Sequence, residues 1–161
     1  VQSFPWTRGN FADALAAEGT VLAFDFGTRR IGVAIGETLL GQARPLTIIA
    51  AEANDRRFEA IARLIDEWQP ARLVVGLPLS LDGEAHDMTD RARRFARQLE
   101  GRFRLPVFLV DERLTSTAAE ESLRARGLNW RARKDSLDAE AAATLLQSHF
   151  DQGSHEISSA R

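Results

Sequence analysis

Acidic residues stand beside short apolar segments at three widely separated places in the chain. Asp25 interrupts the segment VLAFDF, Asp111 and Glu112 follow VFLV, and Asp138 precedes an alanine-rich segment. Carboxylates that converge repel one another, and a divalent cation between them removes the repulsion. Mg²⁺ and Mn²⁺ prefer such hard oxygen ligands, and two of these ions can activate a water and stabilise the leaving oxygen of a phosphodiester. The acids therefore indicate a hydrolytic centre with two metal ions.

Each of these acids also has an ordinary structural explanation. Asp25 could break a strand at a turn, and Asp111 or Glu112 could be a solvated strand end. Asp138, in the first turn of a helix, would be stabilised by the helix dipole whatever the function. The set is more informative than its members because the order of the elements predicts a shared edge.

The segments between the acids predict strands that alternate with helices. Strands are expected at 21–26, at 30–37, within 40–49, at 73–76 and at 107–110. Helices are expected from Asn54 as the N-cap to Pro70, from about Met88 to Gly101, from a capping box at Thr117 to Gly127, and from about Ser136 to Phe150. Short connections make the first three strands an antiparallel meander, and the alternating units add two parallel strands. The expected fold class is α/β, a mixed five-stranded sheet flanked by helices.

The carboxyl ends of parallel strands meet at one edge of a sheet, where open α/β sheets bind their ligands. Asp25 is in phase with Val21 and Ala23 along its strand, and Glu112 follows the last parallel strand. Small residues in the last helix would let it approach the sheet closely. We therefore expect Asp138 to reach the edge that carries Asp25 and Glu112.

Charge is distributed unevenly along the 161 residues. The chain has 21 Lys and Arg against 23 Asp and Glu, a net charge of -2, which argues against a uniformly basic nucleic-acid binder. Residues 89–134 nevertheless hold twelve bases and six acids, a net +6. In the loop expected at 124–134, the candidate nucleic-acid contacts are Arg131, Arg133, Lys134 and, for base stacking, Trp130. The helix-face arginines 91, 94 and 97 are more simply explained as solvated.

Several classes of protein are disfavoured by composition. The chain has no cysteine, which excludes disulfides and Cys-ligated zinc, and its three histidines are far apart in sequence. No apolar run has the length of a membrane span, and the first residues lack the apolar core of a signal peptide, so we expect a cytoplasmic protein. We expect an N-terminal extension at 1–20, one domain at 21–152 and a flexible tail at 153–161.

Four ordered motifs resemble those of the YqgF/RuvX family. They are DFGTRRIGVA at 25–34, VGLPL at 75–79 followed by Asp82-Gly83, DERLT at 111–115, and Asp138 with LLQ at 145–147. The resemblance covers residues 21–151. It implies an RNase H-like fold related to Holliday junction resolvases, and a nuclease that processes the 5′ end of precursor 16S rRNA.

The resemblance also implies roles for individual residues. Asp25, Glu112 and Asp138 correspond to the catalytic, metal-binding set for two Mg²⁺ or Mn²⁺ ions, with Asp111 as a helper. The residues suited to phosphate contact are Arg30, Arg113, Thr28 and Thr115. The arginines could instead order the carboxylates as ion pairs, and the threonines could simply serve turns or helix starts. His86 follows Asp82-Gly83, where a general base could reach the site, although a solvated loop histidine explains it better.

Three functions follow as hypotheses. The first is a metal-dependent endonuclease acting on structured precursor rRNA, in free form or in ribosomal particles. The second is a resolvase of branched DNA, and the third is a nucleic-acid-binding or ribosome-assembly module without catalysis. Phosphates are alike in RNA and DNA, and no reader of the 2′-hydroxyl is recognisable in the sequence, so the substrate stays open. A monomer and a homodimer are both compatible with the sequence.

Overall fold

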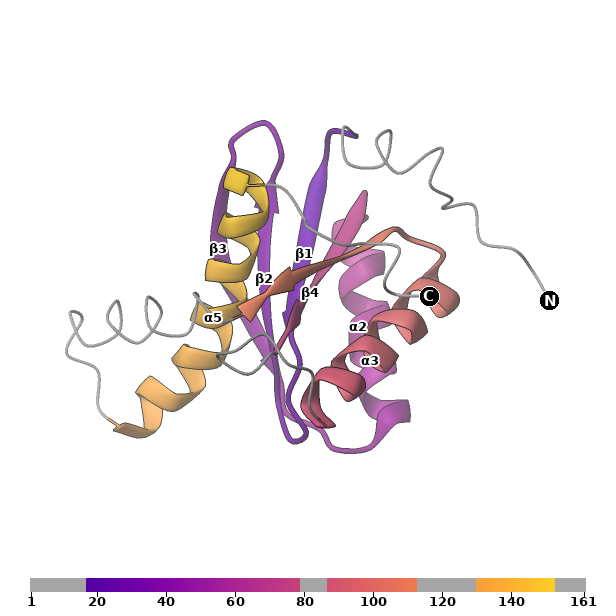
Figure 1. Cartoon of the computed structure of the whole chain (residues 1–161), viewed down its shortest axis with the longest axis vertical. Helices are drawn as coiled ribbons and strands as arrows, with labels where there is room; N and C mark the ends of the chain where they lie inside the picture. Colours follow the sequence, from indigo (N-terminus) through magenta and orange to yellow (C-terminus); the bar gives the residue numbers. More distant parts are fainter. Residues whose placement is uncertain (1–16, 79–86, 113–129, 153–161) are drawn as a thin grey trace.

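The computed structural model describes residues 17–78, 87–112 and 130–152, of which 130–137 and 152 are described through their backbone only. The described strands are β1 (Thr20–Asp25), β2 (Ile31–Glu37), β3 (Gln42–Ile49), β4 (Arg72–Leu77) and β5 (Val107–Asp111). They form one five-stranded sheet in the order β3-β2-β1-β4-β5 (Figure 1). β2 pairs antiparallel with β1 and β3, while β4 pairs parallel with β1 and β5. The predicted mixed sheet and its meander are confirmed, in the arrangement of an RNase H-like fold.

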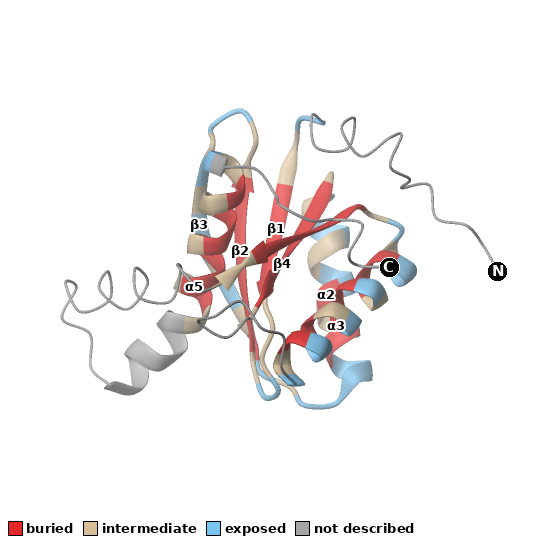
Figure 2. Cartoon of the chain, in the orientation of Figure 1, coloured by how far each residue is buried: buried red, intermediate tan, exposed pale blue. Residues whose placement is uncertain are grey.

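Helices cover both faces of the sheet. α2 (Asn54–Trp68) and α3 (Asp87–Phe103) lie against one face, and α5 (Trp130–Gln152) lies against the other (Figure 1). Strand β1 serves both layers, because successive side chains point to opposite faces. Leu22 and Phe24 pack with the α2 and α3 layer, whereas Val21 and Ala23 pack with α5. Figure 2 shows the resulting buried central strands between partly exposed helices.

The apolar spacing of residues 54–68 explains helix α2, although this helix begins differently from the prediction. Phe58 and Ile61 are buried, and the helix ends at Trp68. Gln69 caps it with a positive φ of 47°, and its backbone N–H donates to the Ile65 carbonyl. Asn54 is the first helical residue, and Ala53 takes the N-cap position without a side-chain cap. The prediction that Asn54 caps this helix is therefore wrong.

Helix α3 continues past the glycine that was expected to stop it. It runs through Gly101 to Phe103, and Arg104 ends it with a φ of 54° and a hydrogen bond from its N–H to the Glu100 carbonyl. A glycine lowers helix propensity without forcing an end when neighbouring residues pack. Phe103 packs against the core and explains why the helix continues for two residues past Gly101.

Helix α5 begins at Trp130, six residues before the predicted Ser136. The intervening residues contain no glycine or proline, so the helix can extend through them. Two corrections follow. Asp138 lies in the third turn, so a favourable helix dipole does not explain it. The positions of Arg131, Arg133 and Lys134 belong to the helix backbone rather than to a loop.

The described part of the chain begins before the domain boundary expected from sequence. The carbonyl of Ala17 accepts a hydrogen bond from Nη1 of the buried Arg72, and Thr20 already belongs to β1. The expected helix from Thr117 and the loop with Asp82 and His86 lie outside the described residues, as does the expected tail at 153–161. Among the helices described, none is both long enough and apolar enough to cross a membrane.

Candidate active site

Asp25 ends the central strand at the carboxyl edge of the parallel part of the sheet. Its register partner on β2 is Gly32, and it continues the alternation of Val21 and Ala23, whose side chains pack with α5. The predicted phase of Asp25 along β1 is thus confirmed. The carboxylate is partly buried on the face that α5 covers.

Glu112 follows β5 directly and reaches back across β4 to Asp25. A Cβ atom placed on Gly76 of β4 would lie 2.6 Å from Oε1 of Glu112 and 2.6 Å from Cδ1 of Leu145, so the missing side chain makes room for this carboxylate. The side chains of Glu112 and Asp25 are joined by a hydrogen bond. Two carboxyl groups from strands on either side of β4 therefore touch at one edge.

Contact between these acids changes their protonation. Burial raises the pKa of Asp25, and the hydrogen bond with Glu112 partly opposes the shift. The pKa of Glu112 is raised to about 10, first by burial, then by the hydrogen bond to Asp25 and by the charges of Asp25 and Asp111. Without a cation, the pair consequently retains a proton at neutral pH.

Asp138 approaches the same edge through the close packing of α5 on β2. A Cβ atom on Gly32 would overlap the backbone carbonyl of Asp138 and lie 3.0 Å from the backbone nitrogen of Ala139. The Asp138 carboxylate forms an ion pair with Arg30, with 3.6 Å between Oδ2 and Nε. The interpretation of Arg30 as a residue that orders a carboxylate therefore has direct support.

The remaining predicted site residues are distributed as follows. Asp111 is the last residue of β5, pairs with Leu77 in the register, and adds negative charge beside Glu112. Thr28 is exposed in the loop after β1, where it lines a pocket beside α2 and α3. Arg113 and Thr115 lie outside the described residues, and the side chains of Arg131, Arg133 and Lys134 are not among those described.

The residues fit a hard divalent cation. The donors at this edge are carboxylate oxygens, and Gly76 and Gly32 leave space around them. The contact of two partly buried carboxyl groups is the arrangement that a cation would stabilise. Within 17–78, 87–112 and 138–151, no three acids or histidines are grouped as a ready-made metal site. Metal binding by Asp25, Glu112 and Asp138 together would require their side chains to move closer to one another.

Two residues that shape this region were not identified from sequence. In the sequence, Gly76 is recognisable only as part of a motif. The structure shows that its missing side chain leaves space for the Glu112 carboxylate. Arg57 is 3% exposed and joins two loops by donating from Nε to the Ala51 carbonyl and from Nη2 to the Gly27 carbonyl. Its spacing of four residues from the buried Ile61 was the available signal for burial.

The acid pair predicts how stability varies with pH in chelator. Between about pH 7 and about pH 9, unfolded Glu112 is ionised whereas the folded side chain keeps its proton, so the free energy of unfolding should fall as pH rises. His149 does not interfere in this window, since burial and the charge of Arg72 lower its pKa to about 4. Urea denaturation at several pH values measures the slope. Glu112→Gln should remove most of this slope, and an equal slope in that variant would refute the assignment.

A mixed sheet in this strand order, with acidic side chains gathered where its parallel strands end, defines an RNase H-like α/β protein. The chain belongs to the RuvX family, whose model is described as Holliday junction resolvase and matches residues 19–152. Two relatives are named "Putative pre-16S rRNA nuclease". The Methylobacillus flagellatus protein is 59% identical over 138 residues, 86% of this chain and 94% of the relative. The Dechloromonas aromatica protein is 55% identical over 139 residues, 86% of this chain and 95% of the relative.

A solved structure gives a more distant comparison. The Thermus thermophilus RuvC in complex with Holliday junction substrate is 18% identical, covers 82% of this chain and 93% of its own, and has a TM-score of 0.48. Similarity at this level carries no argument about the site. The family assignment depends on the family match and the relatives, and it confirms the resemblance found in the sequence motifs.

Proposed function

We propose that the protein is a metal-dependent endonuclease that hydrolyses phosphodiester bonds in the 5′-end maturation of precursor 16S rRNA, in the cytoplasm. The observation that carries the proposal is the contact of the Asp25 and Glu112 carboxyl groups at the carboxyl edge of the sheet. The names of the relatives support both the nuclease activity and the RNA substrate.

Asp25, Glu112 and Asp138 are proposed as the residues that bind two Mg²⁺ or Mn²⁺ ions, with Asp111 adding negative charge. When bound, the metal supplies activation of the attacking water and stabilisation of the leaving oxygen. Gly76 keeps space free for the Glu112 carboxylate. Arg30 holds Asp138 at the edge before binding and is suited to contact the phosphate once Asp138 is released.

The proposed nucleic-acid contacts extend away from the acids. They are Arg30, Thr28, Arg113, Thr115, Arg131, Arg133 and Lys134. Lys134 stands one helical turn before Asp138, so the basic positions at the start of α5 lead toward the acids. Such contacts would position the phosphate backbone without reading sequence.

The second candidate function is resolution of branched DNA, which the description of the family favours. A phosphate held by carboxylate-bound metal and arginines fits either nucleic acid. Action on whole ribosomal particles, and action as a monomer or a homodimer, remain proposals of the same kind. A non-catalytic assembly module is the third candidate. It would be favoured if the protein cleaved neither precursor rRNA nor a DNA junction with either metal ion.

The purified protein should cleave precursor 16S rRNA with Mg²⁺ or Mn²⁺ and should lose this activity in chelator. Removal of the metal removes the activation of the attacking water and the stabilisation of the leaving oxygen, so the expected loss is nearly complete. A four-way DNA junction of equal nucleotide concentration serves as the comparison substrate. Faster cleavage of the junction would assign resolvase activity, and cleavage that persists unchanged in chelator would refute metal dependence.

A further inference from the structure

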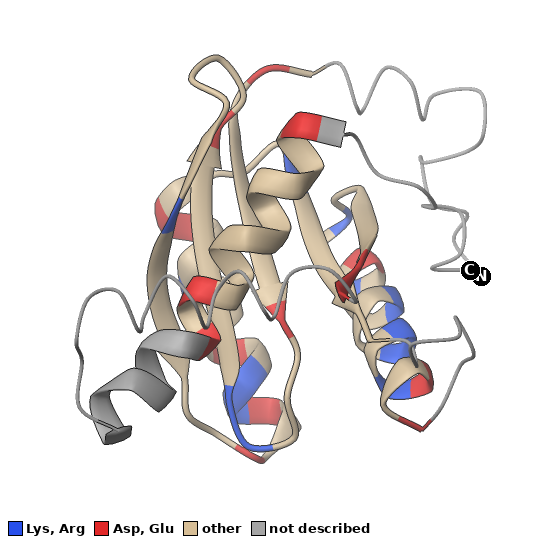
Figure 3. Cartoon of the chain, turned by 60° about the vertical axis from the view of Figure 1, so that its left-hand side comes forward, with Lys and Arg blue, Asp and Glu red and all other residues tan. Residues whose placement is uncertain are grey.

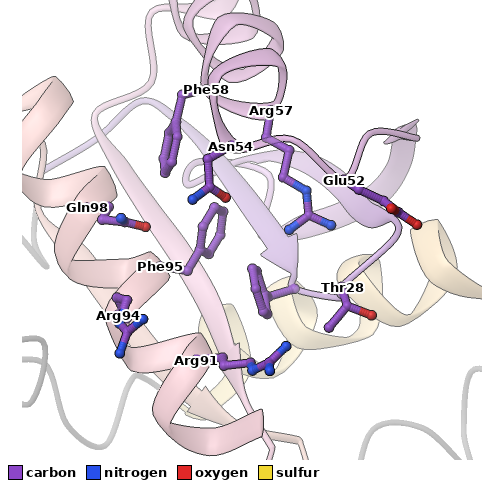
Figure 4. Close-up of a pocket in the computed structure, with 10 residues that line it drawn as sticks. Thr28, Glu52, Asn54, Arg57, Phe58, Arg91, Arg94, Phe95 and Gln98 are labelled. Carbon is purple, nitrogen blue, oxygen red and sulfur yellow. The ribbon is translucent and has the colours of Figure 1, made fainter.

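A polar pocket lies on the face of the sheet that α2 and α3 cover, near the edge at which Asp25 lies. It has a volume of about 330 Å³ and lies between α2, α3 and the loop that follows β1 (Figure 4). Phe26, Phe58 and Phe95 form its apolar part. Thr28 lines it and stands three residues after Asp25, so their Cα atoms are at most about 11 Å apart.

Hydrogen-bond donors dominate the polar lining of this pocket. Arg57 is nine-tenths buried or more, and its Nε and Nη2 are held by the carbonyls of Ala51 and Gly27. Within the described part of the chain, Arg57 makes no other hydrogen bond, so Nη1 has donors available to a ligand. Figure 4 shows the guanidinium of Arg57 directed from α2 toward the loop that carries Thr28, at one side of the pocket.

Helix α3 contributes the exposed charges. Arg91 and Arg94 line the pocket one turn apart, and Figure 3 shows basic residues along this helix. Arg91 also forms an exposed ion pair with Asp87, with 3.3 Å between Nε and Oδ2. Arg97, the next basic residue along the same exposed face, does not line the pocket.

The charge of the lining favours an anion. Three arginines face one acid, Glu52, whose carboxylate forms an exposed pair with Arg29 at 3.6 Å and also interacts with the charge of Arg57. The hydroxyl of Thr28 and the amides of Asn54 and Gln98 supply further donors. A phosphate group, which only accepts hydrogen bonds and matches guanidinium geometry, has the complementary chemistry.

We propose that this pocket binds a backbone phosphate of the substrate strand, beside the phosphodiester that lies at Asp25 and Glu112. The inference depends on the proposed function, because it assigns the flanking part of the same substrate. Asp25 ends β1, and Phe26, the next residue, packs with the α2 and α3 layer and lines the pocket. A nucleic-acid strand that crosses this edge of the sheet would therefore meet the acids on one side and the pocket on the other. Arg57, Arg91, Arg94 and Thr28 are the binding residues.

A charge reversal with a matched control tests the proposal. Arg94→Glu and Arg97→Glu change the same charge at exposed positions of one helix, and only Arg94 lines the pocket. Binding of a fluorescein-labelled single-stranded RNA is measured in chelator, where cleavage does not interfere. Arg94→Glu should weaken binding by about tenfold or more, and Arg97→Glu by about twofold or less. The salt dependence of binding should lose a slope of about 0.7 to 1 in Arg94→Glu.

The outcomes separate this inference from the proposed function. Equal weakening by both variants, with equal Tm values, would show general electrostatics and overturn the pocket. Inorganic phosphate is the second probe, with the Nε–H signals of Arg57 and Arg94 followed by NMR. Inorganic phosphate could shift these signals while Arg94→Glu leaves RNA affinity unchanged. The pocket would then bind free phosphate and not the nucleic-acid backbone, and the inference would be wrong. Failure of the proposed function appears instead as absence of metal-dependent cleavage by the unmodified protein.

Discussion

Replacing Asp25 by Asn is expected to lower metal-dependent cleavage by about a thousandfold or more and to raise the Tm of the metal-free protein. Loss of a carboxylate ligand removes several kcal/mol of transition-state stabilisation, and each 1.36 kcal/mol is about a factor of ten in rate. The gain in stability has a separate cause. Burial disfavours the charged form of the Asp25 carboxylate, the hydrogen bond with Glu112 opposes this only in part, and the neutral amide removes the cost of burying a charge.

A combination of two measurements makes this prediction specific. Cleavage rates are compared with thermal unfolding in chelator and with added Mg²⁺, which should stabilise the unmodified protein and leave Asp25→Asn nearly unaffected. Asp66→Asn, on the exposed side of α2, is the matched control and should change neither measurement. Retained cleavage would remove Asp25 from the catalytic set. Loss of cleavage together with a lower Tm would show a damaged fold rather than a missing ligand.

Replacing Gly32 by Ala is expected to destabilise the protein by about 3 kcal/mol and to reduce cleavage. The added methyl group would overlap the backbone carbonyl of Asp138, and backbone atoms cannot rotate away as a side chain can. Helix α5 would have to move from the sheet, which would expose part of the packing of Ala142 and Leu145. Asp138 would move with it, so stability and activity should fall together.

Gly41→Ala provides the comparison for this prediction. Gly41 has a φ of 63°, and no atom lies within 4 Å of the position that a Cβ would take, so alanine there costs only the unfavourable backbone conformation, about 1 to 2 kcal/mol. It lies in the turn between β2 and β3 and should leave cleavage intact. Urea denaturation gives both free energies of unfolding. A cost at Gly32 no larger than the cost at Gly41 would contradict the close approach of α5.

The strands were predictable because their signal is local. VLAFDF, LVVG and VFLV are short runs of strand-forming residues, and the period of two places Asp25 on the face of Val21 and Ala23 without knowledge of any contact. The shared edge of Asp25 and Glu112 followed from the parallel pairing of β1, β4 and β5. This part of the candidate site required only the order of elements.

Other features depended on packing between distant segments. The pairing of Asp138 with Arg30 and the space that Gly76 leaves for Glu112 arise from side chains that meet across elements, and no local pattern encodes them. The predicted beginnings of two helices were wrong for a related reason. Asn54 and Ser136 are favourable N-cap residues in isolation. Helix α2 nevertheless begins with Asn54 as its first helical residue, and α5 begins at Trp130, before Ser136.

The carboxylate of Asp138, which pairs with Arg30, is also the one that the proposed function assigns to a divalent cation. A cation that takes this carboxylate frees the guanidinium for a phosphate, and a phosphate that attracts the guanidinium frees the carboxylate for a cation. Under the proposed function, the two ligands thus favour each other's binding through an exchange of partners. Thermodynamic reciprocity then requires that Mg²⁺ increase affinity for nucleic acid by the same factor by which nucleic acid increases affinity for Mg²⁺.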